Sequence, residues 1–108
     1  MTDSHSSIYV YPAIFTPDDN GMYFIHFPDI ENCITCGDDI KDGMIMAEDA
    51  LALIVYTDFE ETGKQAPEFT PIEKIKLKKG EFATYVMCNT KRYRKTYKKE
   101  VDTWAKGK

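Results

Sequence analysis

The sequence predicts an α+β fold in which one long helix packs on an antiparallel sheet. Three observations favour this class. Short segments rich in β-branched and aromatic residues lie before and after a single long segment whose apolar residues have helical spacing. No run of apolar residues is long enough to cross a membrane, and a length of 108 residues suits one domain with one modest core. The expected order of elements is therefore β-β-β-α-β-α.

The first three strands are expected to form an antiparallel meander. Residues 8–15 and 22–27 have the composition of strands, and the Asn20-Gly21 pair between them is typical of turns that need positive φ angles. Residues 33–36 form a short third strand, which ends at a glycine. Strands this close in the sequence pair with their neighbours through short turns.

Pro12 constrains the first of these strands. Proline has no N–H group to donate to a neighbouring strand. The first strand is therefore expected at an edge of the sheet, or with its missing donor turned outward.

The helix is expected over residues 40–62. Asp39 is a favourable N-cap residue, Asp42 puts a negative charge in the first turn, and Gly63 supplies a stop. The apolar positions that follow a spacing of three and four are Ile40, Met44, Ala47, Leu51, Ile54, Val55 and Phe59.

Further elements are expected after the helix. They are a loop over residues 64–71, one helical turn at 71–75, a turn at 78–80, a fourth strand over 81–88 and a short basic helix over 91–99 that is capped by Asn89 or Thr90.

Both faces of the predicted sheet are apolar. In the second strand, Tyr23, Ile25 and Phe27 share one side, and Phe24 and His26 share the other. One helix can cover one face, so the C-terminal helix, a second copy of the chain or a partner should cover the second. A homodimer is favoured, because two-fold pairs dominate among oligomers.

The charge of the chain is strongly polarised. Residues 1–70 carry 14 acidic and two basic residues, a net charge of −12, and residues 71–108 carry 12 basic and four acidic residues, a net charge of +8. The sum is the overall charge of −4. This distribution favours an acidic face for a basic partner and a basic tail for an acidic one, although charged faces are also ordinary in solvated proteins.

Several stretches of the chain resemble the HicB antitoxin family. Residues 11–15 read Tyr-Pro-Ala-Ile-Phe, residues 21–30 read Gly-Met-Tyr-Phe-Ile-His-Phe-Pro-Asp-Ile, and residues 33–38 read Cys-Ile-Thr-Cys-Gly-Asp before an Ala-Glu-Asp-Ala-Leu helix. The family pattern has Val, Leu and Gly where this chain has Ile25, Ile30 and Asn32. The resemblance covers residues 9–60 and continues more loosely over residues 82–97.

This resemblance implies a fold and a role. The fold is the HicB-like arrangement, a degraded ribonuclease H-like or half-ferredoxin sheet with its helix. The role is that of an antitoxin, which binds a HicA-like toxin, a small basic protein that cleaves mRNA, and covers its active surface. Separately, residues 1–7 have no features of a secretory signal, so the cytoplasm is the expected location. The acidic residues expected to contact the basic side chains of the toxin are Asp29, Glu31, Asp38 and Asp39.

The C-terminal segment departs from the family pattern. Many HicB proteins carry a DNA-binding ribbon-helix-helix or helix-turn-helix segment at the C-terminus, and a ribbon-helix-helix unit needs about 40 residues from typical element lengths. The sequence is therefore divided into a HicB-like domain over residues 1–88 and a basic segment over residues 89–108 that is too short for such a unit. This segment could still bind RNA or operator DNA, in a dimer, or simply form a solvated helix. Its candidate residues are Lys91, Arg92, Arg94, Lys95, Lys98 and Lys99.

No catalytic, metal or cofactor site is expected. Cys33 and Cys36 have Cys-x-x-Cys spacing, but in a strand they point to opposite faces, which favours reduced, packed thiols. His26 lies between two apolar residues with no evident orienting partner, which favours packing over a role as a general base. Capping and turn formation explain the carboxylates that might imitate a ribonuclease H site, namely Asp29, Asp38, Asp39 and Asp42.

Overall fold

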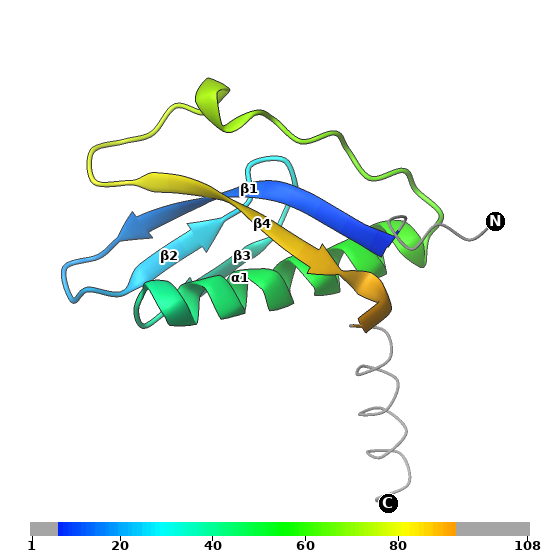
Figure 1. Ribbon diagram of the computed structural model, residues 1–108, viewed down its shortest axis with the longest axis horizontal. Helices are drawn as coiled ribbons and strands as arrows, with labels where there is room; N and C mark the ends of the chain where they lie inside the picture. Colours follow the sequence, from blue (N-terminus) through cyan, green and yellow to red (C-terminus); the bar gives the residue numbers. More distant parts are fainter. Residues whose placement is uncertain (1–6, 93–108) are drawn as a thin grey trace, which may run out of the picture.

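The computed structural model describes residues 7–92, and it has the predicted α+β architecture. Figure 1 shows one sheet with the long helix on one face and an extended connection on the other. The elements are β1 (Ile8–Pro17), β2 (Tyr23–His26), β3 (Ile34–Gly37), α1 (Ile40–Val55), the π-helical turn η2 (Tyr56–Glu60), the 3₁₀ turn η3 (Ile72–Lys74) and β4 (Phe82–Asn89).

The sheet has the order β3-β2-β1-β4, and all neighbouring strands are antiparallel. The meander of the first three strands is therefore confirmed, and β4 adds beside β1. The prediction of an edge position for the first strand is wrong, because β1 lies between β2 and β4. Pro12 is nevertheless tolerated, since β2 pairs only with residues 14–17 of β1 and Pro12 faces β4 alone.

The strand register sorts the two faces as the alternation predicts. Phe15 pairs with Ile25, and Tyr11 pairs with Val86, so these side chains share the inner face that α1 covers. The fully buried core also includes Leu51 of the helix. On the outer face, register pairs join Phe24 with Cys36, His26 with Ile34, Pro12 with Tyr85 and Val10 with Met87.

The β1–β2 turn and the β2–β3 turn each contain one left-handed residue. Gly21 has a φ of +84° in the β1–β2 turn, whereas Asn20 does not have a positive φ, so the predicted pairing of two such residues is wrong. The side chain of Asp18 organises this turn instead, because its Oδ1 accepts hydrogen bonds from the N–H groups of Asn20 and Met22. Asn32 has a φ of +66° in the β2–β3 turn.

The helix begins where the sequence predicts and changes character before its predicted end. Asp39 is the N-cap, α1 ends at Val55, and the chain continues through η2 to a left-handed Gly63 with a φ of +77°. The π-helical turn shifts the later side chains relative to the α-helical period. Of the predicted apolar face, Ile40 is exposed, and the other members are buried or half-buried.

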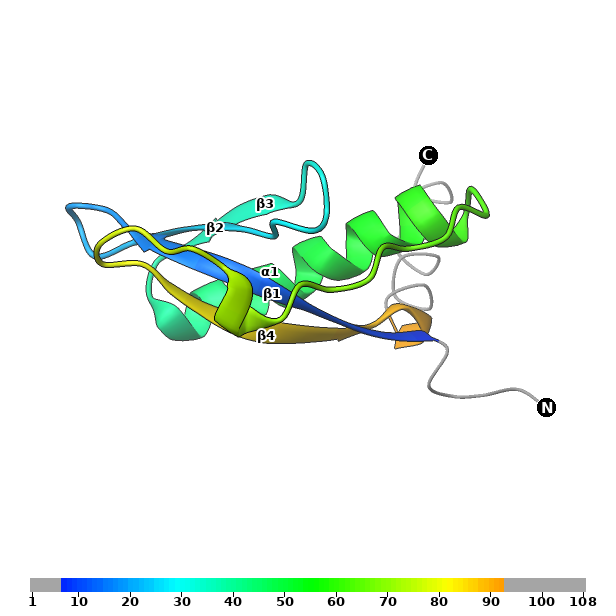
Figure 2. The same ribbon diagram turned by 90° about the horizontal axis from the view of Figure 1, so that it is seen from above.

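The connection between η2 and β4 covers part of the outer face of the sheet. The ring of Phe69 packs edge-on against Tyr85, and the phenol of Tyr85 accepts a hydrogen bond from the backbone N–H of Ile72. Pro12 and Ile14 are buried on this face. Seen from above in Figure 2, the connection runs along β1 and β4 and leaves β2 and β3 open.

A second helix begins at residue 90, one residue before the predicted start. The side chain of Asn89 caps it, because its Oδ1 accepts a hydrogen bond of 3.0 Å from the N–H of Lys91. Most of the predicted helix over 91–99 lies outside the described residues.

Candidate functional site

The four acidic residues predicted to meet a toxin fall into two separate pairs. Asp29 and Glu31 lie in the turn between β2 and β3, and Asp38 and Asp39 lie between β3 and α1. The four-residue strand β3 therefore separates the pairs by roughly 13 Å, at about 3.3 Å per residue. The fold does not bring all four residues together.

Asp29 holds the long connection in position. Its Oδ2 accepts a hydrogen bond of 2.8 Å from the N–H of Thr70, and its Oδ1 accepts one of 2.6 Å from the hydroxyl of Thr70. Nearby, the phenol of Tyr11 donates to the carbonyl of Pro67. These bonds fasten residues 67–70 beside the part of β1 that β2 leaves unpaired.

Asp38 and Asp39 belong to the start of α1. The Oδ1 of Asp39 accepts a hydrogen bond of 2.8 Å from the N–H of Asp42, and the Oδ2 of Asp42 accepts one of 2.8 Å from the N–H of Asp38. This reciprocal arrangement satisfies N–H groups that a helix start leaves without partners. It also fixes the carboxylates of Asp39 and Asp42 at one end of the helix.

The outer face of α1 combines large apolar side chains with further carboxylates. We define the helix stripe as Ile45, Met46, Asp49 and Leu53, all of which are exposed. These positions follow the helical period on the side opposite the buried Ala47 and Leu51. The stripe was not predicted from the sequence. A signal was available, because large apolar residues occur among the acidic residues of the predicted polar face.

Acidic charge is concentrated around this helix. Residues 38–61 carry eight carboxylates and one lysine, a net charge of 1 − 8 = −7. The carboxylates are those of Asp38, Asp39, Asp42, Glu48, Asp49, Asp58, Glu60 and Glu61. The carboxylate of Glu60 is bonded to Tyr9 and Thr90, and the other seven form a surface that attracts cationic partners and repels nucleic acid.

A second exposed surface lies on the outer face of β2 and β3. We define the outer sheet patch as Phe24, His26, Ile34 and Cys36, which are joined in two register pairs. A shallow pocket adjoins it and is lined in part by Phe24, Ile34 and the exposed Glu31. This patch is more apolar than the helix stripe, and fewer charged residues surround it.

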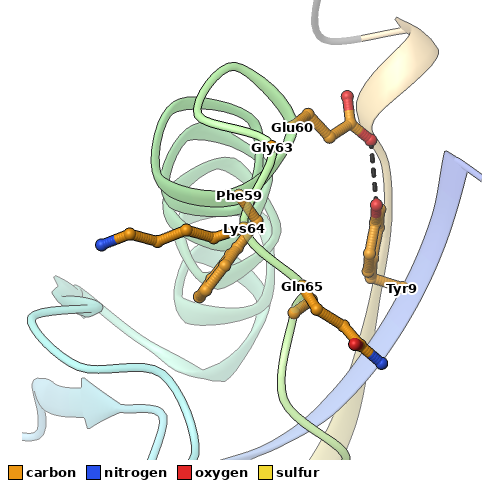
Figure 3. Close-up of a pocket in the computed structure, with 7 residues that line it drawn as sticks. Tyr9, Phe59, Glu60, Gly63, Lys64 and Gln65 are labelled. Atoms are coloured by element: carbon orange, nitrogen blue, oxygen red, sulfur yellow. Dashed lines mark hydrogen bonds between the residues drawn. The ribbon is translucent and has the colours of Figure 1, made fainter.

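A polar junction joins the start of β1, the π-helical turn and the start of the second helix. Figure 3 shows the phenol of Tyr9, which donates a hydrogen bond of 3.1 Å to Oε2 of Glu60. The hydroxyl of Thr90 donates to the same oxygen over 2.5 Å. Burial, and then the bond to Glu60, raise the pKa of Tyr9 to about 12. Sequence reasoning could not find this junction, because its members lie far apart in the chain.

The cysteines and His26 have the environments of packing residues. Cys33 and Cys88 are buried, and burial raises the pKa of each thiol to about 12, whereas Cys36 is exposed on the other face. The predicted opposite orientation of Cys33 and Cys36 is thus confirmed. Among residues 7–92, Nδ1 of His26 is buried without a hydrogen-bond partner, so none of them orients the ring through this atom as a general base requires.

The described part of the chain contains no arrangement of three or more His, Cys, Asp or Glu side chains suited to a metal ion. Among residues 7–92 there is also no helix of the length and apolarity needed to span a membrane. Lys91 and Arg92 are exposed at the start of the second helix. The other predicted nucleic-acid contacts, Arg94, Lys95, Lys98 and Lys99, lie outside the described residues.

Comparison with known proteins identifies relatives of this fold. Antitoxin HicB 1 of Photorhabdus laumondii subsp. laumondii is 39% identical over 54 residues, which are 50% of this chain and 35% of the relative, so the chain spans about a third of that relative. A chain of a toxin–antitoxin complex from Streptococcus pneumoniae matches with a TM-score of 0.70 and 25% identity, over 80% of this chain and 72% of the other. The N-terminal domain of Burkholderia pseudomallei antitoxin HicB matches with a TM-score of 0.63 and 22% identity, over 72% of this chain and 95% of that domain.

A family model provides the assignment. The family is described as HicB_like antitoxin of bacterial toxin-antitoxin system, and its model matches residues 11–99. The match covers most of the chain and includes the sheet, the helix and the start of the basic segment. This protein therefore belongs to the HicB-like antitoxin family of bacterial toxin–antitoxin systems.

Proposed function

We propose that this chain neutralises a small basic HicA-like toxin that cleaves mRNA, by binding the toxin and covering its active surface. Family membership supports this role, and the similar chain from Streptococcus pneumoniae is described as part of a toxin–antitoxin complex. The observation that carries the proposal is the acidic charge on and beside α1, where residues 38–61 have a net charge of −7.

The physical basis is competition for one cationic surface. A protein that cleaves RNA must bind a polyanion, so its working surface carries Lys and Arg side chains. Carboxylates on the antitoxin compete for those same side chains. Complementary charge also speeds the encounter between the two proteins and selects the partner.

The predicted contact residues contribute to this surface to different degrees. Asp38 and Asp39 lie at the N-terminal end of α1 and extend its acidic outer face. Asp29 and Glu31 are predicted contacts at the far end of β3, and the carboxylate of Asp29 is already bonded to Thr70. We expect Asp38 and Asp39 to contribute more to toxin binding than Asp29.

The experiment is co-expression with a HicA-like toxin, sought as a small basic protein encoded beside this gene. Expression of that protein alone should stop growth and degrade mRNA. Co-expression of this chain should restore growth and keep the mRNA intact. The purified chain should protect RNA from the purified toxin at equimolar ratio. Growth arrest that this chain does not relieve, with no complex on gel filtration, would rule out the proposal.

We propose that the chain performs no chemistry of its own. The raised pKa values of Cys33 and Cys88 support this, because a protonated thiol is a poor nucleophile. RNA incubated with the purified chain and Mg²⁺ should remain intact. Cleavage that a chelator abolishes and that Asp38→Asn reduces would contradict this part of the proposal.

An alternative function is the binding of RNA or operator DNA through the basic C-terminal segment. The exposed Lys91 and Arg92 favour it, since both are available to phosphates. Binding of this kind should weaken steeply as salt increases. A gel shift that persists after deletion of residues 90–108 would count against it.

We also propose that the chain forms a homodimer and that it acts in the cytoplasm. The outer sheet patch exposes Phe24 and Ile34, and a second copy could cover them. Sedimentation should give twice the monomer mass for the native chain, and Phe24→Asp should reduce it to the monomer mass. A native chain that is monomeric at high concentration would contradict the homodimer.

A further inference from the structure

We infer that the helix stripe is the surface on which the basic partner docks. The partner would place apolar side chains against Ile45, Met46 and Leu53, and cationic side chains against Asp49 and the neighbouring Glu48. This inference rests on the proposed function and deepens it, because it names a contact surface that differs from the four acidic residues predicted from the sequence.

The first argument is the exposure of large apolar side chains where the fold does not need them. A helix that packs on one sheet requires one apolar face, and α1 has that face in Ala47, Leu51 and Val55. On the opposite side, Ile45 is 53% exposed, and Leu53 is 40% exposed. Positions 45, 49 and 53 are spaced four residues apart, one on each successive turn of the helix, so their side chains form a continuous strip.

The second argument is charge, which decides between occupants. Asp49 lies within the strip, and the exposed Glu48 flanks it. A second copy of the chain would present the same negative strip and be repelled, and RNA, DNA or an anionic membrane would be repelled as well. A cationic protein with apolar side chains between its Lys and Arg residues would match both the apolar and the acidic side chains of the stripe.

The outer sheet patch lacks the second component. It exposes Phe24 and Ile34, but Glu31 is the carboxylate that lines its pocket, at one end. Burial of this patch would gain apolar contact without selecting a basic partner over any other. The helix stripe therefore fits a basic toxin better.

The apolar component is tested with a matched pair of leucine substitutions. Leu53→Ala removes an exposed leucine from the stripe, and Leu77→Ala removes a leucine of similar exposure, 43%, from the connection before β4. The probe is a catalytically inactive form of the HicA-like toxin used in the co-expression experiment. Leu53→Ala should raise its Kd at least about tenfold, mainly through faster dissociation, whereas Leu77→Ala should leave the Kd within about twofold.

The charged component is tested with two double substitutions that remove the same charge. Glu48→Gln with Asp49→Asn neutralises the stripe, and Asp19→Asn with Glu73→Gln neutralises two exposed carboxylates elsewhere. The stripe variant should slow association several-fold and reduce the dependence of affinity on salt. The distant variant should change the association rate much less.

Each outcome decides a different point. A loss of affinity in Phe24→Ala, with none in the two stripe variants, would move the partner to the outer sheet patch and overturn the inference while the proposed function stands. Wild-type affinity in the stripe variants and in Phe24→Ala would overturn it too. A wild-type chain that forms no complex would instead remove the proposed function, and the inference with it. Circular dichroism verifies that each variant is folded.

Discussion

Within residues 7–92, Asn32 is the non-glycine residue with a left-handed backbone, at a φ of +66°. It occupies the position where the resembling family pattern has glycine, and asparagine tolerates this conformation better than most residues do. The left-handed backbone therefore explains why this chain can have asparagine at the position where the family pattern has glycine. The turn it forms leads from Phe27 into the buried Cys33.

Substitution of Asn32 tests this explanation. Asn32→Ala should lower the free energy of unfolding by about 1 kcal/mol, because a Cβ without a compensating polar group disfavours the left-handed region. Asn32→Gly should change it by less than about 0.5 kcal/mol. Urea denaturation measures both values, and an alanine variant as stable as wild type would show that the positive φ is not needed.

Tyr9 should make stability depend on alkaline pH. Its folded pKa is raised from 10.0 to about 12, first by burial and then by the hydrogen bond to Glu60. Below pH 10 the phenol keeps its proton in both states, so the contribution is complete. Between pH 10 and about 12 the unfolded chain loses the proton first, and the contribution of Tyr9 to stability is lost as pH rises.

The Tyr9→Phe variant isolates this effect. Its free energy of unfolding should fall less steeply between pH 10 and 12 than that of wild type. Part of the slope should remain, because burial also raises the pKa values of Tyr11, Cys33 and Cys88. Identical slopes for the two proteins would mean that the phenol does not titrate differently in the folded state.

The three thiols should react at different rates. Cys36 is exposed, whereas Cys33 and Cys88 are buried with pKa values raised to about 12, which keeps them protonated near neutral pH. Iodoacetamide should label one thiol of the native chain quickly and all three in urea, as counted by mass spectrometry. The Cys36→Ser variant should lose the fast reaction, and rapid native labelling of Cys33 would contradict its burial.

At the level of elements, two glycines set the distance between the helix and the sheet. A Cβ at Gly37 in β3 would lie 2.4 Å from the Cα and N of Gly43, and a Cβ at Gly43 would lie 2.9 Å from Cε2 of Phe15 and 3.0 Å from Cδ1 of Ile25. The start of α1 thus approaches β3 more closely than any other residue type permits. This contact positions the acidic N-terminal end of the helix.

The two positions should differ in their tolerance of alanine. Gly37→Ala should destabilise the fold by about 3 kcal/mol or more, because the added atom meets backbone that cannot move without shifting the helix. Gly43→Ala should cost about 1 kcal/mol, since side chains can adjust and alanine favours helix. Thermal unfolding compares the two, and equal stability of both variants with wild type would contradict the close packing.

The sequence predicts the elements better than their placement. Alternation in Tyr23–His26 and the three-and-four spacing of the helix are local patterns, so the meander, its two faces and the start of α1 follow from them. The central position of β1 depends on its pairing with β4, which is remote in the sequence. The sequence of the connection before β4 has no periodicity that would predict its packing on the sheet, where Phe69 contacts the ring of Tyr85.

The candidate site was predictable to a smaller extent. The acidic character of the first 70 residues is evident from composition, and Asp39 is recognisable as a cap. The apolar component of the helix stripe depends on which helix face the sheet buries, and the Tyr9–Glu60 bond depends on tertiary contacts between distant segments. Both require coordinates, because side chains far apart in the chain create them.

At the level of the whole molecule, the helix that packs on the sheet provides a surface that is both acidic and apolar. The outer face of α1 carries apolar side chains among carboxylates, and residues 38–61 account for a charge of −7 within a chain of −4. Twelve of the 14 basic residues follow later in the sequence, from Lys74 onward. A molecule of this kind attracts a cationic protein at one face by long-range charge and retains it by apolar contact.

The most direct test of this account is the affinity of the chain for a HicA-like toxin, sought as a small basic protein encoded beside its gene, measured by calorimetry over a salt series from about 0.05 to 0.5 M. The account predicts an equimolar complex whose Kd rises steadily with salt and that persists at the highest concentration through its apolar contacts. No heat of binding at low salt, or an affinity that does not change across the series, would contradict the central role of the acidic face.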